Sequence, residues 1–180
     1  MKEIEGSKLF LTQSFRFGGA VAEAGNRILK RLGENKLIKP NPMINSKIGQ
    51  INKAKSYTVI CRTNATILRR CLEYAKDNKK VNCIGNLNET LRDFEAGYYL
   101  WKGEIDKVKS PKVLVYQTWE NLVEEVTLTA EPDIKGIMNF IEDYEEETLN
   151  IIKRIESTVT KNEENADVIL TTAHKLKDRF

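Results

Sequence analysis

A group of polar residues in this sequence shares one feature: each lies at or just beyond the carboxyl end of a predicted strand. The members of the group are Gln13, Arg16, Arg62, Thr63, Asn64, Thr171, Thr172, His174 and Lys175. Arginine binds phosphate oxygens through two parallel hydrogen bonds, while Thr, Asn and His offer neutral hydrogen bonds to sugar, phosphate or base. Ligand crevices in open α/β sheets lie at this end of the strands. The group therefore predicts a phosphorylated or polyanionic ligand, and the alternative is that these side chains only cap strand ends.

Several kinds of catalytic site are absent from the sequence. It holds no Gly-x-x-x-x-Gly-Lys-Ser/Thr loop and no Cys-x-x-Cys pair, and a single histidine cannot build a histidine-rich metal cage. The acidic run at 142–147 would spread over more than one face of a helix, so we interpret it as solvated rather than metal-binding. We predict no metal site, and we expect no ATP hydrolysis by this chain alone.

Aromatic residues gather in the middle of the chain, at Tyr98, Tyr99, Trp101, Tyr116 and Trp119. Rings of this kind can stack on the bases of single-stranded nucleic acid. They also supply large apolar surfaces for packing between helices. We favour packing as the interpretation.

The elements that must position the polar group are predicted strands at 8–11, 57–61, 80–84 and 166–171. Residues 57–61 form a β-branched apolar run of the kind that a parallel sheet buries on both faces. A helix follows directly, with Asn64 as its N-cap and apolar residues at helical spacing as far as Asp77-Asn78. The rhythm of strand, helix and strand over 56–85 favours a right-handed parallel crossover, and 166–171 is expected to re-enter the same sheet.

Helical patterns fill most of the remaining chain. Gly18-Gly19 precede a predicted helix with apolar residues that include Val21, Ile28 and Leu32, whereas the prolines make 33–55 a loop or ordered connector. Residues 88–102, 119–127 and 132–156 are predicted to be helical and form an insertion. The predicted fold is α/β, a parallel sheet with a small helical insertion. We divide it into 1–87, the helical 88–162, and 163–180 with the return strand.

Composition limits the function classes without choosing one. The chain has 180 residues, with 41% hydrophobic and 31% charged residues, as expected for a soluble globular protein. Its net charge of +3 is too small to predict nucleic-acid binding by itself. Three cysteines, an odd number, favour a reducing intracellular compartment. No secretory signal or membrane-spanning apolar run is present, so we predict no membrane partner.

Several motifs, in order along the chain, resemble those of superfamily 1 (UvrD-like) DNA helicases. Leu11-Thr-Gln-Ser-Phe-Arg-Phe-Gly18 resembles motif IV, and this spelling is closest to the F-box DNA helicase family. Val59-Ile-Cys-Arg-Thr-Asn-Ala65 resembles the segment that follows, and Val81 to Gly85 resembles the next strand, with Asn86 where the family usually has a second glycine. Ala166-Asp-Val-Ile-Leu-Thr-Thr-Ala-His-Lys175 resembles motif V.

The resemblance implies a second RecA-like motor lobe, incomplete here. In that family Arg16 would reach the γ-phosphate of ATP, with Gln13 and Phe15 in support. The single-stranded DNA track would be lined by Arg62, Thr63, Asn64, Thr172, His174 and Lys175. ATP and Mg²⁺ would serve the complete enzyme, a 3′-to-5′ helicase of DNA repair and recombination, and we expect neither to bind this chain alone. The motor would need a first RecA-like lobe, in the same polypeptide or a separate chain.

The sequence also departs from the family pattern. After Lys175-Leu-Lys177 it reads Asp178-Arg-Phe180, where motif V of the family continues as Lys-x-Lys-Gly-Leu-Glu. The phosphate-binding loop, the Mg²⁺-binding acidic motif and motif VI are absent from these residues. The alternative function is therefore a DNA- or protein-binding remnant module without motor activity, and a further one is an unrelated α/β domain. The family implies a nuclear location in a eukaryote and a cytoplasmic one in a bacterium.

Overall fold

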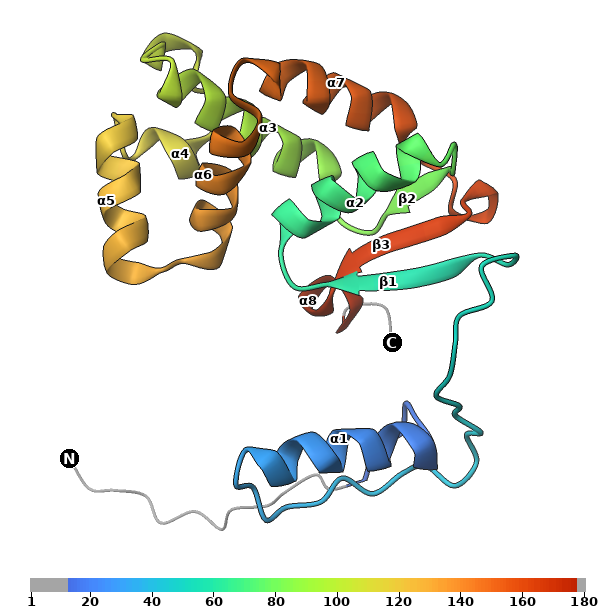
Figure 1. Ribbon diagram of the computed structural model, residues 1–180. Coiled ribbons are helices and arrows are strands. Elements are labelled where there is room, and N and C mark those ends of the chain that lie inside the picture. The colour runs from blue at the N-terminus through green and yellow to red at the C-terminus, as the bar shows by residue number, and fades with distance from the viewer. Residues whose placement is uncertain (1–12, 178–180) are drawn as a thin grey trace, which may run out of the picture. The chain divides into compact units, whose positions relative to one another are not determined.

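The computed structural model describes residues 13–177, and the chain divides into two compact units (Figure 1). The N-terminal unit comprises residues up to Ile51, and the C-terminal unit begins at Asn52. The predicted strand at 8–11, the first two residues of the Leu11–Gly18 motif and the final Asp178-Arg-Phe180 lie outside the described residues. The division after Ile51 falls inside the predicted segment 1–87, and the predicted boundaries at 87 and 162 stay predictions.

The C-terminal unit is built on a three-stranded parallel sheet with the order β1-β3-β2. The strands are β1 (Tyr57–Cys61), β2 (Val81–Cys83) and β3 (Val168–Thr172), and α2 (Asn64–Lys76) connects β1 to β2. The prediction that the chain returns to the same sheet near residue 166 is confirmed, because β3 pairs with β1 from Val168 to Thr172 and with β2 from Val168 to Leu170. The result is an α/β unit with a parallel sheet.

The sheet is buried unevenly. Val59 and Cys61 face α2, which packs against all three strands, whereas Thr58 and Ile60 are exposed, Ile60 at 56%. The prediction that 57–61 is buried on both faces is therefore wrong for the sheet as described. Successive side chains of a strand point to opposite faces, and α2 covers only one of them.

The outer edge of β2 is covered by the chain that leads toward β3. Val159 forms a parallel bridge with Val81, and the Thr160 amide donates to the Val81 carbonyl at 2.8 Å. The Asn82 side-chain amide donates to the Thr160 carbonyl, also at 2.8 Å. These contacts satisfy backbone groups that an open edge would leave unpaired.

The helical insertion supplies most of the core. Its helices are α3 (Leu87–Trp101), α4 (Pro111–Leu114), α5 (Trp119–Thr129), α6 (Pro132–Tyr144) and α7 (Thr148–Thr158). Short 3-10 turns occur at Ile105–Lys107, Glu145–Glu147 and Glu163–Asn165. The ring of Phe140 is fully buried and meets Phe94 edge-to-face at a centroid distance of 5.0 Å. Helices α3 and α6 approach so closely at Gly97 that an added Cβ would lie 2.4 Å from Ile137 Cγ2.

The aromatic residues of the insertion pack within it, as the favoured interpretation predicts. Tyr98 is buried, and Tyr99, Trp101, Tyr116 and Trp119 are half-buried against the core. The hydroxyl of Tyr98 also donates to Glu146 Oε2 at 3.1 Å, and the Lys102 ammonium contacts Glu146 Oε1 at 2.7 Å. A carboxylate of the acidic run therefore serves a local ion pair and a hydrogen bond.

The N-terminal unit contains α1 (Gly19–Arg31) followed by a connector without regular helix or strand, as predicted for 33–55. Gly33 adopts a φ of +79° just after α1, and the amides of Gly33 and Glu34 donate back to Lys30 and Leu29, a common helix ending. Gly18 lies so close to the connector that a Cβ there would be 1.8 Å from the Ile44 carbonyl oxygen. Only glycine fits at this position.

None of the described helices combines the length and apolar character needed to span a bilayer.

Candidate functional site

The parallel register brings two of the predicted contact segments to one edge of the sheet. Cys61, the last residue of β1, pairs with Thr172, the last residue of β3 (Figure 1). The chain then leaves β1 through Arg62, Thr63 and Asn64, and leaves β3 into the short helix α8 (Ala173–Lys177). Segments that lie more than a hundred residues apart in sequence therefore start from neighbouring points of the carboxyl edge.

The side chains after β1 have different tasks. Arg62 is exposed. Thr63 is extended and is the N-cap of α2, because its Oγ1 accepts a hydrogen bond from the Thr66 amide at 3.3 Å. The prediction of Asn64 as N-cap is thus wrong by one residue, and Asn64 is the first helical residue. The positive end of the α2 dipole and its first unpaired amides lie at this edge beside Arg62, an arrangement that favours an anion.

The residues at the end of β3 and in α8 divide into an inward and an outward pair. Thr171 and Thr172 are buried. The Thr171 hydroxyl donates to the Thr172 carbonyl at 3.2 Å, and Thr172 Oγ1 accepts from the Lys175 amide at 3.5 Å. His174 is exposed and Lys175 is half-buried. Thr172 therefore holds the start of α8, while His174 and Lys175 are the side chains with access to a ligand.

Two residues that the sequence did not assign to the site shape this edge. Gly85 has a φ of +112°, and a Cβ there would lie 2.4 Å from Lys175 Cδ and 2.7 Å from its Nζ. The glycine thus leaves room for the Lys175 side chain. Asn86 caps α3, since its Oδ1 accepts from the Glu89 amide at 3.1 Å. An Asn with Glu three residues later is a recognisable helix start, so this signal was present in the sequence.

The other predicted site residues belong to the N-terminal unit. Gln13 forms an isolated parallel β-bridge with Lys39, and the Ser14 amide donates to the Lys39 carbonyl at 2.8 Å. The Arg16 amide donates to Ser14 Oγ at 3.1 Å. Gln13, Phe15 and Arg16 are all exposed, Phe15 at 76%. They are thus presented on a segment that is fixed by backbone pairing with the connector.

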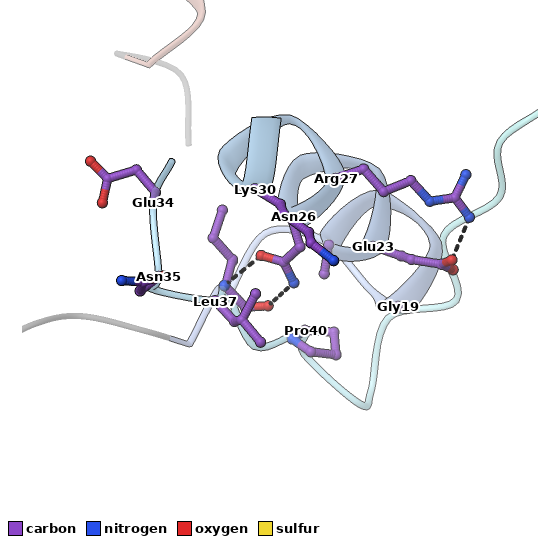
Figure 2. Close-up of a pocket in the computed structure, with 11 residues that line it drawn as sticks. Gly19, Glu23, Asn26, Arg27, Lys30, Glu34, Asn35, Leu37 and Pro40 are labelled. Carbon is purple, nitrogen blue, oxygen red and sulfur yellow. Dashed lines mark hydrogen bonds and ion pairs between the residues drawn. The ribbon is translucent and has the colours of Figure 1, made fainter. Parts of the chain in front are cut away.

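A cavity of about 580 Å³ lies within the N-terminal unit, between α1 and residues 34–40 (Figure 2). Asn26 and Ile38 both line it and are joined by two hydrogen bonds: Asn26 Nδ2 donates to the Ile38 carbonyl at 3.0 Å, and Asn26 Oδ1 accepts from the Ile38 amide at 2.7 Å. Glu23 and Arg27 form an ion pair at the rim. Gln13, Phe15 and Arg16 do not line this cavity.

Residues 13–177 contain no group of three or more His, Cys, Asp or Glu side chains arranged to hold an ion.

Comparison with known proteins found a sequence similarity to a DNA helicase. The chain is similar to F-box DNA helicase protein 1 of Schizosaccharomyces pombe, with 24% identity over 191 residues that cover 94% of the chain. The chain spans about a fifth, 21%, of the length of that relative. No protein-family model matches the chain. No solved structure matches it either. The similarity suggests a relation to DNA helicases and a DNA-related role.

Proposed function

We propose that this chain is part of the second RecA-like lobe of a superfamily 1 DNA helicase and holds single-stranded DNA at the carboxyl edge of its sheet. The observation that carries the proposal is the Cys61 to Thr172 register, which sets the Arg62 segment beside α8. The similarity to a DNA helicase over 94% of the chain supports the same function. Side chains and amides at such an edge would contact the sugar-phosphate backbone of the DNA, so binding would depend little on base sequence.

The side chains contribute in distinct ways. Arg62, His174 and Lys175 would contact phosphates, and the amides at the start of α2 would add neutral donors. Thr63 and Thr172 would act indirectly. Each accepts a hydrogen bond from a backbone amide at the start of the helix that follows, and so holds the backbone next to Arg62 or Lys175 in position. They are positioning residues in this account, and Asn64 is left to contact sugar or base.

The N-terminal unit has a separate role in the proposal. Arg16 would stabilise the charge that develops on the γ-phosphate of ATP, which with Mg²⁺ supplies the phosphoryl group whose transfer drives stepping. Exposure of Gln13, Phe15 and Arg16 on one braced segment supports this role. The site would be completed by a first RecA-like lobe, so we expect no turnover from this chain alone.

Fluorescence anisotropy with a labelled single-stranded oligothymidine tests the DNA contact. We expect the purified chain to bind, with an affinity that falls as salt rises. The double variant His174→Ala, Lys175→Ala should bind at least roughly tenfold more weakly, because the charge-assisted hydrogen bond of Lys175 alone is worth about 1.5 kcal/mol. Its slope of log affinity against log salt should be shallower by at least about 0.7, the value for each charged phosphate contact on a single strand.

The matched control is Lys153→Ala, which removes the same charge from an exposed position on α7. It should leave the affinity close to that of the wild type. Equal weakening by both variants would indicate nonspecific electrostatic attraction of the DNA and contradict a binding site at the carboxyl edge. Absence of binding by a folded chain would overturn the proposal in favour of a protein-binding module.

A further inference from the structure

Two cysteines from different elements meet behind the carboxyl edge. Cys71 lies on the inner face of α2 and Cys83 ends β2, and their Sγ atoms are 3.7 Å apart. A disulfide bond needs a separation of about 2.05 Å, so an approach of less than two ångströms, roughly 1.7 Å, would join them. The third cysteine, Cys61, is buried at the end of β1.

The two thiols differ in access. Cys83 is half-buried and lines a cavity of about 380 Å³ at the carboxyl end of β2, together with Asn82, Gly85 and Asn86. Cys71 is fully buried and does not line this cavity. A small oxidant that enters from solvent would therefore meet Cys83 first, with Cys71 directly behind it.

Electrostatics assign the same order. The Cys71 thiol, through its hydrogen bond, lowers the pKa of Cys83, and the nearby Lys175 charge lowers it further against the effect of burial. The pKa of Cys71 is raised, by the same hydrogen bond and by burial. Cys83, the less buried of the two residues, is thus the one that favours the thiolate, the form that reacts with peroxides.

We infer that Cys83 and Cys71 form a hydroperoxide-sensitive thiol pair, with Cys83 as the attacking and Cys71 as the resolving residue. The Cys83 thiolate attacks one oxygen of hydrogen peroxide, the O–O bond breaks, and protonation of the leaving oxygen gives water and a Cys83 sulfenic acid. The Cys71 sulfur then attacks Cys83 Sγ as its own proton leaves, and a second water is released. Two thiols and one peroxide give one disulfide and two waters. This inference does not depend on DNA binding.

Peptide mapping of the wild-type chain decides the matter. The purified chain is treated with hydrogen peroxide, quenched with N-ethylmaleimide under denaturing conditions, digested without reductant and analysed by mass spectrometry. We expect a linked peptide that joins Cys71 and Cys83, lighter by two hydrogen atoms, with Cys61 alkylated, and reductant should restore both thiols. A linkage through Cys61, or Cys83 oxidised beyond sulfenic acid without a disulfide, would overturn the inference.

Variants sharpen the assignment. Cys83→Ser should abolish the linked peptide, whereas the matched variant Cys61→Ser should retain it. Cys71→Ser should leave a sulfenic acid on Cys83 that dimedone traps. Because Cys71 is fully buried, the wild-type map stands as the deciding result if that variant does not fold. A linked peptide that persists in Cys83→Ser would contradict the pairing.

Discussion

The two units of this chain place their apolar residues in opposite ways. In the C-terminal unit the described residues form one buried cluster that extends from Cys61 to Leu170 across the sheet and the insertion. Among the described residues of the N-terminal unit, Ala22 is the hydrophobic residue that is buried. Its exposed large apolar residues are Phe15, Val21, Ile28, Leu32, Leu37, Met43, Ile48 and Ile51.

The difference shows what holds each unit. The C-terminal unit is stabilised by burial of side chains, the dominant favourable contribution to folding. The described N-terminal unit is held chiefly by hydrogen bonds to backbone, such as Asn26 with Ile38 and the Gly18 amide with Ser46 Oγ at 2.7 Å. Hydrogen bonds of this kind contribute only about 1 kcal/mol each. We therefore expect global stability to depend on the C-terminal unit.

The largest expected effect comes from Phe140 in the centre of the core. Phe140→Ala removes a fully buried ring that contacts Phe94 and Tyr144. It should lower the free energy of unfolding by about 3–5 kcal/mol. Urea unfolding followed by the fluorescence of Trp101 and Trp119 measures the change. The matched exposed variant, Met43→Ala, should alter the free energy of unfolding by no more than about 0.5 kcal/mol. Equal losses in the two variants would contradict the contrast between the two units.

A smaller loss is expected where α3 and α6 touch. Gly97→Ala places a methyl group 2.4 Å from Ile137 Cγ2, so the Ile137 side chain or the helices themselves must shift. Overpacking of this kind should cost about 1–3 kcal/mol in urea unfolding. Gly49→Ala is the control, because nothing lies near its added Cβ. If Gly97→Ala were as stable as the wild type, the close packing described for the insertion would be wrong.

The N-terminal unit should respond weakly. Ile28 lies on α1 and is 58% exposed, so Ile28→Ala should change the free energy of unfolding by no more than about 0.5 kcal/mol. The same urea titration tests this. A loss of about 2 kcal/mol or more would mean that this side chain is buried in the folded protein, and the contrast between the units would fail.

At neutral pH the smallest change in the free energy of unfolding is expected when the hydroxyl of Tyr74 is removed. Burial, followed by the neighbouring Tyr57 hydroxyl, raises the pKa of Tyr74 from 10.0 to about 12. A raised pKa means that the fold favours the protonated form. Its stabilising contribution is therefore complete below the ordinary value and is lost as pH rises through about 12. Ultraviolet titration of the phenolate, with Tyr74→Phe subtracted, measures the step, and titration of Tyr74 at its ordinary pKa would contradict the packing.

Much of the fold was predictable from local patterns. The β1, α2, β2 succession follows from a β-branched run, a helical stripe and a second short strand, and the return at β3 follows from Val168, Ile169 and Leu170. The order of strands was not predictable, because no local pattern records that β3 lies between β1 and β2. Exposure of Ile28 and Leu32 was not predictable either, since helical spacing shows which residues share a face and not what covers it.

The candidate site was predictable in part. Polar residues at strand ends predicted Arg62, His174 and Lys175 as ligand contacts, and that role stays a prediction. The parallel register brings their segments together. The inward role of Thr172 and the clearance that Gly85 leaves for Lys175 depend on tertiary contacts. The N-cap was misplaced by one residue because Thr63 and Asn64 are both favoured at that position. The roles of Gln13, Phe15 and Arg16 toward ATP stay predictions.

Hydrogen exchange, with and without single-stranded DNA and read by mass spectrometry, tests the central claim most directly. We predict that bound oligothymidine slows exchange in peptides that span the start of α2 after Arg62 and the junction of β3 with α8. Exchange in α5 and α6 should stay unchanged. Protection confined to the helical insertion or to the N-terminal unit, with the carboxyl edge unaffected, would contradict the account.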